Sequence, residues 1–574
     1  MLSRIKLADL YSKPFLALTA QLPYGASSTW KNVLSCLYAI GSPTLLLYSL
    51  TLTVVYRFWI RKEFKGLLEE HPLVPAHFRK RAKAAKYILQ NCHHVPTKVL
   101  QGEDGYLSSA VVLGENTIWW QRLQHEIEQR RRPLTQSLGA QIFWVAVSQV
   151  FVWIATFQKA GDVTIWTGLS SGLMLLWMLP VVWGTYEVGN FPDSDAIKEA
   201  IANSEGKFVL AGATEAKPLP PALPQPKTAM LQRDSNSLTD YVRSVAERAN
   251  SSTSTNGSRI PLSAVQPFNH LYREYQVPDR LSDNAKHAPQ FLWLSIQGDE
   301  IETGATMNYA RLHTSRVTAS YIIDAFKSAR EKMIRSKNPN GREAHGPNLE
   351  TLNRFWGTRD EIARYCDRNV HPGSLAVFKD SKRPNEPPDW AIAVLAAIVA
   401  LCVTWGSLGA GILVAYLTPT KGLGCFSGSI LLYGVLDTVS FFLFWGAGEL
   451  SWSYCHYHEN KRKISIIIKF KGALAVCTRL CAKFISILAA IWEVTSTILA
   501  YSNIWGNCWC DTVYFSRRDT AYTAIFIDTS MISDESRHFW YGGLFLSLIL
   551  CAAAAIFFSI SRESRSDSRQ VPEE

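Results

Sequence analysis

The stretch LLYGVLDTVSFFLFWGAGEL, residues 431–450, is apolar enough to cross a lipid bilayer, yet Asp437 stands near its middle. An aspartate at the centre of a membrane span costs about 2.5–3.5 kcal/mol on insertion scales. The large apolar residues around it contribute roughly −3 to −6 kcal/mol in total, so the segment still inserts. We therefore expect Asp437 to face the interior of a helix bundle and to have a polar partner there.

Segments of the same apolar character recur along the chain of 574 residues. Only 19% of the residues are charged, against about 25% in a soluble protein, and the deficit is concentrated in windows of roughly 20 residues, the length that crosses a bilayer. The sequence predicts an all-α membrane bundle of about seven transmembrane helices, with mixed α/β cytoplasmic regions and a disordered linker. The predicted spans are 33–56, 138–157, 165–186, 390–417, 429–450, 484–505 and 539–560.

The distribution of basic residues predicts the orientation. The net charge is +11, and clusters of Lys and Arg follow the first span, precede the second and separate the fifth from the sixth, as expected of cytoplasmic loops. This pattern favours anionic lipid over nucleic acid as the partner of the basic segments. We expect the N-terminus on the exoplasmic side and the C-terminus in the cytoplasm, in the plasma membrane or the endomembrane system.

The spans divide the chain into segments. Residues 214–263 are rich in Pro, Ser and Thr, a composition that cannot bury a core, and they hold two glycosylation sequons, at Asn250 and Asn256, which a cytoplasmic linker would leave unmodified. The expected order is an exoplasmic segment 1–32, the first span 33–56, a basic cytoplasmic region 57–137, a two-span hairpin 138–186, cytoplasmic residues 187–213, the disordered linker 214–263, a second cytoplasmic region 264–389, a four-span bundle 390–560 and a cytoplasmic tail 561–574.

The basic segment 79–86 belongs to a predicted amphipathic helix. Phe78, Ala82 and Ala85 share one face, and basic residues flank it. Two interpretations are equally open: the helix lies on anionic lipid, or it packs against the rest of its region with a solvated charged face. Further elements predicted in the cytoplasmic regions are a strand at 106–113 (YLSSAVVL), a helix with Trp119, Leu123 and Ile127 on one stripe, a strand in FLWLSI and a long helix over 307–334.

Two acidic residues are the candidate chemical groups. Asp437 and Glu493 fall at similar depths on neighbouring predicted spans, and if they face each other they would share a proton. Such a pair is typical of a proton-linked transporter, or of an intramembrane acid–base enzyme such as a cyclase acting on a lipophilic substrate. In the alternative, each carboxyl is held by a hydroxyl or amide and joins helices; the candidate partners are Ser440, Thr438, Tyr433, Gln141 and Gln149.

The cysteines and one mixed cluster supply weaker candidates. Cys425 lies in a predicted outer loop and could form a disulfide with Cys508 or Cys510, because that compartment is oxidising. Cys455, His458 and Glu459 share a helical face and are a weak candidate metal site. No nucleotide, zinc-protease or nucleophile-elbow motif is found, and no cofactor is expected.

A run of motifs suggests a family. The order is WW before RRRPLT, then LLWMLPVVWG, NYARLHTS, TWGSLGAGILVAYLTPTKGLGC and NCWC. From about Arg57 onward the chain resembles a widespread family of uncharacterised fungal multi-pass integral membrane proteins. Where members have a basic residue after the cysteine of G-L-G-C, this chain has Phe426. The resemblance implies a membrane architecture and a fungal source and supplies no activity, so the leading expectation is a non-enzymatic membrane or interaction protein.

Overall fold

The computed structural model is almost entirely helical in the part of the chain that it describes. It describes residues 29–91, 106–130, 163–188, 305–336, 389–417, 423–460, 466–501 and 529–560, with isolated positions between 139 and 208 and residue 366. Six segments in these ranges are long and apolar enough to cross a membrane, as expected for a multi-pass membrane protein. They are Pro43–Leu68, Leu169–Val188, Trp390–Leu417, Cys425–Ser451, Ile466–Ala500 and His538–Ile560.

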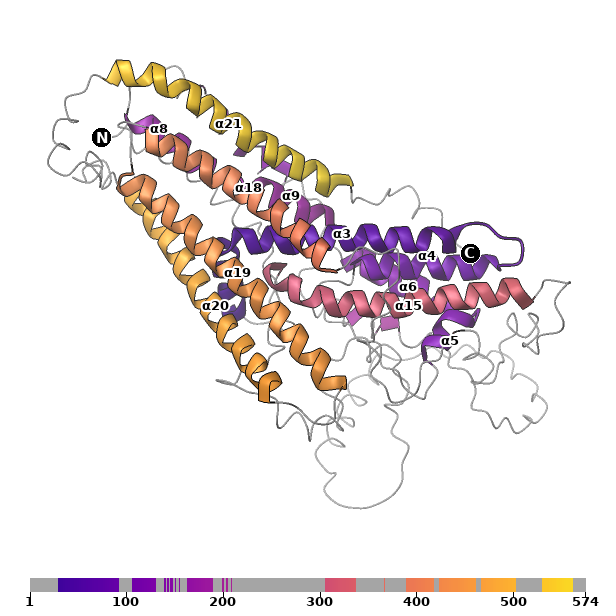
Figure 1. Ribbon diagram of the computed structural model, residues 1–574. Helices are drawn as coiled ribbons and strands as arrows, with labels where there is room; N and C mark the ends of the chain where they lie inside the picture. Colours follow the sequence, from indigo (N-terminus) through magenta and orange to yellow (C-terminus); the bar gives the residue numbers. More distant parts are fainter. Residues whose placement is uncertain are drawn as a thin grey trace, which may run out of the picture.

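Four long helices form one side of the bundle (Figure 1). The indole of Trp492 donates to the carbonyl of Ser429, and Arg479 donates to the hydroxyl of Ser451. The neighbouring helices α19 (Cys425–Asn460) and α20 (Ile466–Tyr501) are therefore antiparallel. The predicted sixth span, 484–505, overlaps the second half of α20, which starts at residue 466 and ends at residue 501. The long helices are α18 (Asp389–Leu417), α19 (Cys425–Asn460), α20 (Ile466–Tyr501) and α21 (Thr529–Ile560).

Two of the predicted spans are not single helices. The third is divided by a turn into α8 (Val163–Met174) and α9 (Met178–Val188), and the first is divided at Ser42 into α2 (Thr29–Gly41) and α3 (Pro43–Leu68). The count of seven spans therefore stays a prediction: the first is broken, and the second, 138–157, lies only partly within the described residues.

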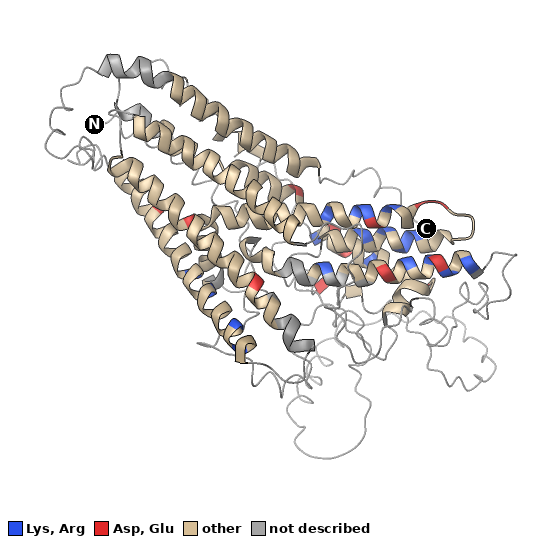
Figure 2. Cartoon of the chain, viewed as in Figure 1, with Lys and Arg blue, Asp and Glu red and all other residues tan. Residues whose placement is uncertain are grey.

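The second half of α3 joins a helical module outside the bundle, formed with α4 (Ala76–Asn91), α5 (Tyr106–Val112), α6 (Asn116–Arg130) and α15 (Asn308–Ser336). A separate apolar core holds this module together, built around Trp119, Trp120 and Phe326. Lys and Arg are interspersed with Asp and Glu along the outer part of α3 and along α15, whereas the long bundle helices are mostly uncharged (Figure 2). The helix predicted with Trp119, Leu123 and Ile127 on one stripe and the long helix predicted over 307–334 are confirmed as α6 and α15.

The strand predicted at 106–113 is wrong. These residues form α5, and no strand occurs in the described ranges. Val111 and Val112 suggested a strand because of their β-branched side chains, but both are buried in the module core, and packing overrides so weak a preference. The second predicted strand, FLWLSI, and the linker 214–263 with Asn250 and Asn256 lie outside the described residues.

The basic helix α4 packs against the module. Phe78, Ala82 and Ala85 are fully buried in the module core, so the apolar face does not lie in lipid. Of the two interpretations of segment 79–86, the structure favours the packed helix. Arg79 also forms an ion pair with Glu70, in the loop before α4.

A buried arginine joins α4 to α5. Arg81 is fully buried and donates to the carbonyls of Val111 and Val112, 3.1 and 3.2 Å away, and to the hydroxyl of Thr117. The last carbonyls of a helix have no partner within it, so Arg81 caps the end of α5. Burial lowers the pKa of Arg81 to about 9, which leaves the guanidinium charged at neutral pH.

We predict that Arg81→Met destabilises the module. The substitution leaves two buried carbonyls without a donor, each worth about 1–3 kcal/mol. Thermal unfolding of the purified full-length protein should show a lower unfolding temperature, and limited proteolysis should cut the module faster. Lys80→Met, at an exposed neighbouring position of α4, is the control and should behave as the wild type. Equal stability of the two variants would contradict the capping role.

Candidate functional site

Helices α2 and α3 form a hairpin inside the bundle. Tyr38 lies against Lys483, and Gly41, one turn further along α2, lies against Ser486, so α2 and α20 run in the same direction. Thr44 contacts Asp437 and Tyr48 contacts Phe441, so α3 runs in the same direction as α19. Because α19 and α20 are antiparallel, α2 and α3 run in opposite directions and turn back at Ser42.

The local sequence explains the turn. Pro43 has no N–H to donate and disfavours the helical conformation of the residue before it. Ser42 accordingly leaves the helical region, with φ −140° and ψ 64°, and Pro43 takes the first position of α3, where proline is favoured. Gly41 permits the close approach: a Cβ atom there would lie 1.8 Å from the backbone oxygen of Ser486.

Asp437 caps the buried start of α3. Its Oδ1 accepts from the backbone N–H of Thr44 at 3.3 Å, and its Oδ2 accepts from the Thr44 hydroxyl at 2.5 Å. The first N–H groups of a helix lack partners and favour a negative charge. Ser42 is a usual capping residue, but its side chain makes no capping bond and instead contacts the Ser440 hydroxyl. The Asp437 carboxylate of α19 therefore caps the start of α3 in place of a local capping residue.

The other backbone groups around the turn also have partners. The Tyr433 hydroxyl donates to the carbonyl of Ile40 at 2.6 Å, and the N–H of Ser42 continues the pattern of α2 by donating to Tyr38. Among the partners expected for Asp437, neither Ser440 nor Tyr433 bonds the carboxylate; both bond the hairpin instead. Thr438 accepts from the indole of Trp405. The actual partner, Thr44, was not among the residues that the sequence suggested.

Glu493 does not pair with Asp437. Its Oε1 accepts from the Thr497 hydroxyl one turn along α20, and its Oε2 is buried without a hydrogen-bond partner among the described residues. Both carboxylates lie within electrostatic range of the Tyr433 hydroxyl. The structure therefore places Asp437 and Glu493 near a common residue but not in the shared-proton contact that the sequence allowed.

A polar ladder along α3 anchors the module to the bundle. The Ser49 hydroxyl donates to the carbonyl of Thr306, and the amide of Asn308 donates to the Thr53 hydroxyl at 2.8 Å. Thr306 lies in the 3-10 helix η3 (Ala305–Met307), directly before α15, and is buried with Asn308. The start of α15 is thus held inside the bundle. The sequence SPTLLLYSLTLT, residues 42–53, carries the signal, as its hydroxyl residues recur within an apolar run.

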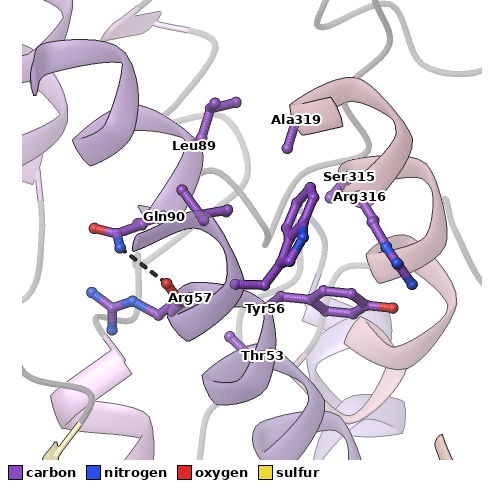
Figure 3. Close-up of a pocket in the computed structure, with 10 residues that line it drawn as sticks. Thr53, Tyr56, Arg57, Leu89, Gln90, Ser315, Arg316 and Ala319 are labelled. Carbon is purple, nitrogen blue, oxygen red and sulfur yellow. Dashed lines mark hydrogen bonds between the residues drawn. The ribbon is translucent and has the colours of Figure 1, made fainter. Parts of the chain in front are cut away.

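A small cavity opens where α3 leaves the bundle (Figure 3). Its volume is about 20 Å³, and its lining comes from α3, α4 and α15, above the 10–15 Å³ that one water molecule needs. Two lining residues are arginines. Arg57 is buried and donates to the carbonyls of Glu187 and Val188 at the end of α9. Arg316 lies over the rings of Tyr56 and Trp59 at 5.8 and 5.6 Å.

The remaining candidates stay predictions. Cys425 begins α19, but Cys508 and Cys510 lie outside the described residues, so the structure does not test the disulfide. Cys455, His458 and Glu459 lie in the last turns of α19, where the structure describes the backbone and not these side chains. Among the described residues no group of His, Cys, Asp and Glu could hold a metal ion.

Comparison of the chain with protein-family models, with curated proteins and with solved structures finds no match. The class of protein therefore rests on the fold itself. Within the described ranges this is an all-α protein with six helical segments that could cross a membrane.

We predict that the capping role of Asp437 needs an acceptor rather than a charge. Asp437→Asn keeps an oxygen that can accept from the Thr44 N–H, whereas Asp437→Leu leaves that buried donor unsatisfied at about 1–3 kcal/mol. Thermal unfolding in detergent should give the order wild type, Asn, Leu from most to least stable. Val439→Leu, at an exposed position of α19, is the control. A leucine variant as stable as the asparagine variant would refute the capping role.

Proposed function

We propose that this is a non-enzymatic multi-pass membrane protein whose helical module is held at the cytoplasmic face and recognises the headgroups of anionic lipids. The observation that carries the proposal is Arg316, which is partly exposed and lines a water-sized cavity between α3, α4 and α15. A headgroup phosphate is too large for the cavity and would contact Arg316 from outside it. Arginine suits a phosphate group because its planar fork donates two hydrogen bonds at once.

The position of the cavity along the membrane normal supports lipid as the ligand. Arg57 bonds the carbonyl of Val188, where one candidate span ends, and the ring of Phe58 contacts Phe557, near the end of another. The cavity is therefore level with the ends of two spans. In a bilayer this is the layer of the headgroups, where Trp59 would also be favoured as an interfacial aromatic residue.

The hairpin supports a revised orientation. The start of α2 and the end of α3 point to the same side of the bundle, so we propose that the hairpin enters and leaves the membrane from the cytoplasm. With the predicted span 138–157, the bundle then has an even number of crossings, and both termini are cytoplasmic. This replaces the exoplasmic N-terminus expected from a continuous first span, and it keeps the basic clusters on the cytoplasmic side.

The alternatives built on paired carboxylates receive no such support. A proton-linked transporter or an acid–base enzyme would use a direct contact between Asp437 and Glu493. The described residues instead give each carboxylate its own hydroxyl partner. A structural role of Asp437 accounts for its place in an apolar helix.

We predict that Arg316→Gln weakens lipid recognition. The wild type in nanodiscs containing phosphatidylserine should unfold at a higher temperature than in phosphatidylcholine alone, because a ligand of the folded state stabilises it. In Arg316→Gln this difference should fall by more than roughly half. Arg335→Gln is the control, since Arg335 lies on the same helix, about 28 Å further from the cavity, and is largely exposed.

Two further results decide the proposal. Adding inorganic phosphate to phosphatidylcholine nanodiscs distinguishes a free anion from a lipid headgroup, and only the lipid should stabilise the protein. Equal stabilisation of the wild type and Arg316→Gln by phosphatidylserine would overturn the assignment of the cavity.

A further inference from the structure

Two cysteines of α20 stand on the outer surface of the bundle. Cys477 and Cys481 are exposed and carry no disulfide. They are four residues apart, and the same face continues with Phe484, Leu488 and Ile491, which are 68%, 44% and 52% exposed. The spacings of four, three, four and three residues keep these five side chains on one helical stripe. In a bilayer this stripe would face the lipid.

The same exposed face continues toward the start of α20 with Leu474 and Phe470, so the depth of the cysteines is judged from the length of the helix. The apolar segment of α20 has 35 residues, about 52 Å of helix, against a hydrocarbon core of about 30 Å, so the helix extends beyond the core. The part of α20 that extends beyond the core is at the start of the helix, because the basic residues of α20 all lie in its first half. About 20 residues counted back from Tyr501 span the core and reach Cys481.

A contact between helices gives the same level independently. The candidate span within α19 ends at Ser451, and the Ser451 hydroxyl accepts from Arg479 at 2.9 Å. Arg479 stands between the two cysteines in the sequence. Cys477 and Cys481 therefore lie where the bundle passes from hydrocarbon to headgroups, on the side where α3 continues into the module.

Other described cysteines do not meet both conditions. Cys402 is exposed but lies 13 residues into α18, about 20 Å from its inner end, and so near the middle of the core. Cys551 is buried in the bundle. The combination of an exposed thiol and a position at the inner boundary singles out the pair on α20.

We propose that Cys477 and Cys481 are S-acylated by long-chain acyl-CoA, through a membrane-bound acyltransferase. The cysteine thiolate attacks the acyl carbonyl carbon, a new carbon–sulfur bond forms, and the bond to the sulfur of coenzyme A breaks. The thiol proton ends on the released coenzyme A, so the exchange of thioesters needs no oxidant or reductant. Juxtamembrane cysteines are the usual sites of this modification.

The surroundings fit the substrate. Lys469 is exposed on the part of α20 that extends past the inner boundary and would attract the anionic phosphates of acyl-CoA. The attached chain would lie along Phe484, Leu488 and Ile491, within the hydrocarbon. The proposal rests on the orientation given above, because it requires the inner end of α20 to face the cytoplasm.

The test uses the full-length protein in membranes of a eukaryotic cell. Free thiols are blocked, thioesters are cleaved with hydroxylamine, and each released thiol is tagged with polyethylene-glycol maleimide, which adds one step in mass. We expect two hydroxylamine-dependent steps in the wild type, one in Cys477→Ala or Cys481→Ala, and none in the double variant. Cys402→Ala is the matched control and should keep both steps.

The outcomes separate the modification from the orientation. In parallel, Lys80→Cys on α4 and the wild type are treated with an impermeant maleimide in intact and in permeabilised cells, and the labelling compared below is the excess of the variant over the wild type. If Lys80→Cys is labelled only after permeabilisation, the orientation holds. In that case S-acylation alone is overturned by the absence of a hydroxylamine-dependent step in the wild type, or by undiminished steps in the double variant. Labelling of intact cells overturns the orientation and the S-acylation together.

Discussion

The structure depends on one constraint: a helix broken inside an apolar bundle must have its freed backbone groups bonded by the protein. Unsatisfied N–H and C=O groups cost several kcal/mol where water is absent. At the Ser42–Pro43 break the N–H of Thr44 is satisfied by Asp437, and the carbonyl of Ile40 by Tyr433. Both partners come from α19. The aspartate that looked out of place in an apolar helix is thus what allows α3 to begin where it does.

From that start α3 runs as one helix into the module, and polar groups of α3 and α4 satisfy the ends of further helices. Arg57 bonds the last carbonyls of α9, and Arg81 bonds the last carbonyls of α5. Ser49 and Thr53 hold the start of α15 in the bundle. Each of these polar groups binds the end of another helix. The bonds of Ser49, Thr53 and Arg57 therefore join the bundle to the module, and Arg81 supplies a cap of the same kind within the module.

The sequence predicted the bundle because apolar runs of span length are a strong signal, and it predicted α6 and α15 from their helical period. It also predicted that Asp437 faces a polar partner. It could not predict which partner, because Thr44 lies 393 residues away and hydrophobicity treats the segment 33–56 as continuous across Pro43. The direction of α2 depends on contacts with α20 that no local pattern encodes. The strand expected at 106–113 failed because the module core decides the conformation of so short a segment.

A measurement of the direction of α2 tests the hairpin at Ser42 most directly. Two doubly spin-labelled full-length proteins are compared by double electron–electron resonance. Both carry a label on an unnatural amino acid at Trp30 of α2, and the second label is at Leu474 of α20 in one and at Ile498 in the other. If the chain turns back at Ser42, Trp30 lies closer to Leu474 than to Ile498, two positions separated by about 36 Å along α20. A shorter distance to Ile498 would mean that α2 continues the line of α3 across the bundle, and the hairpin would be wrong.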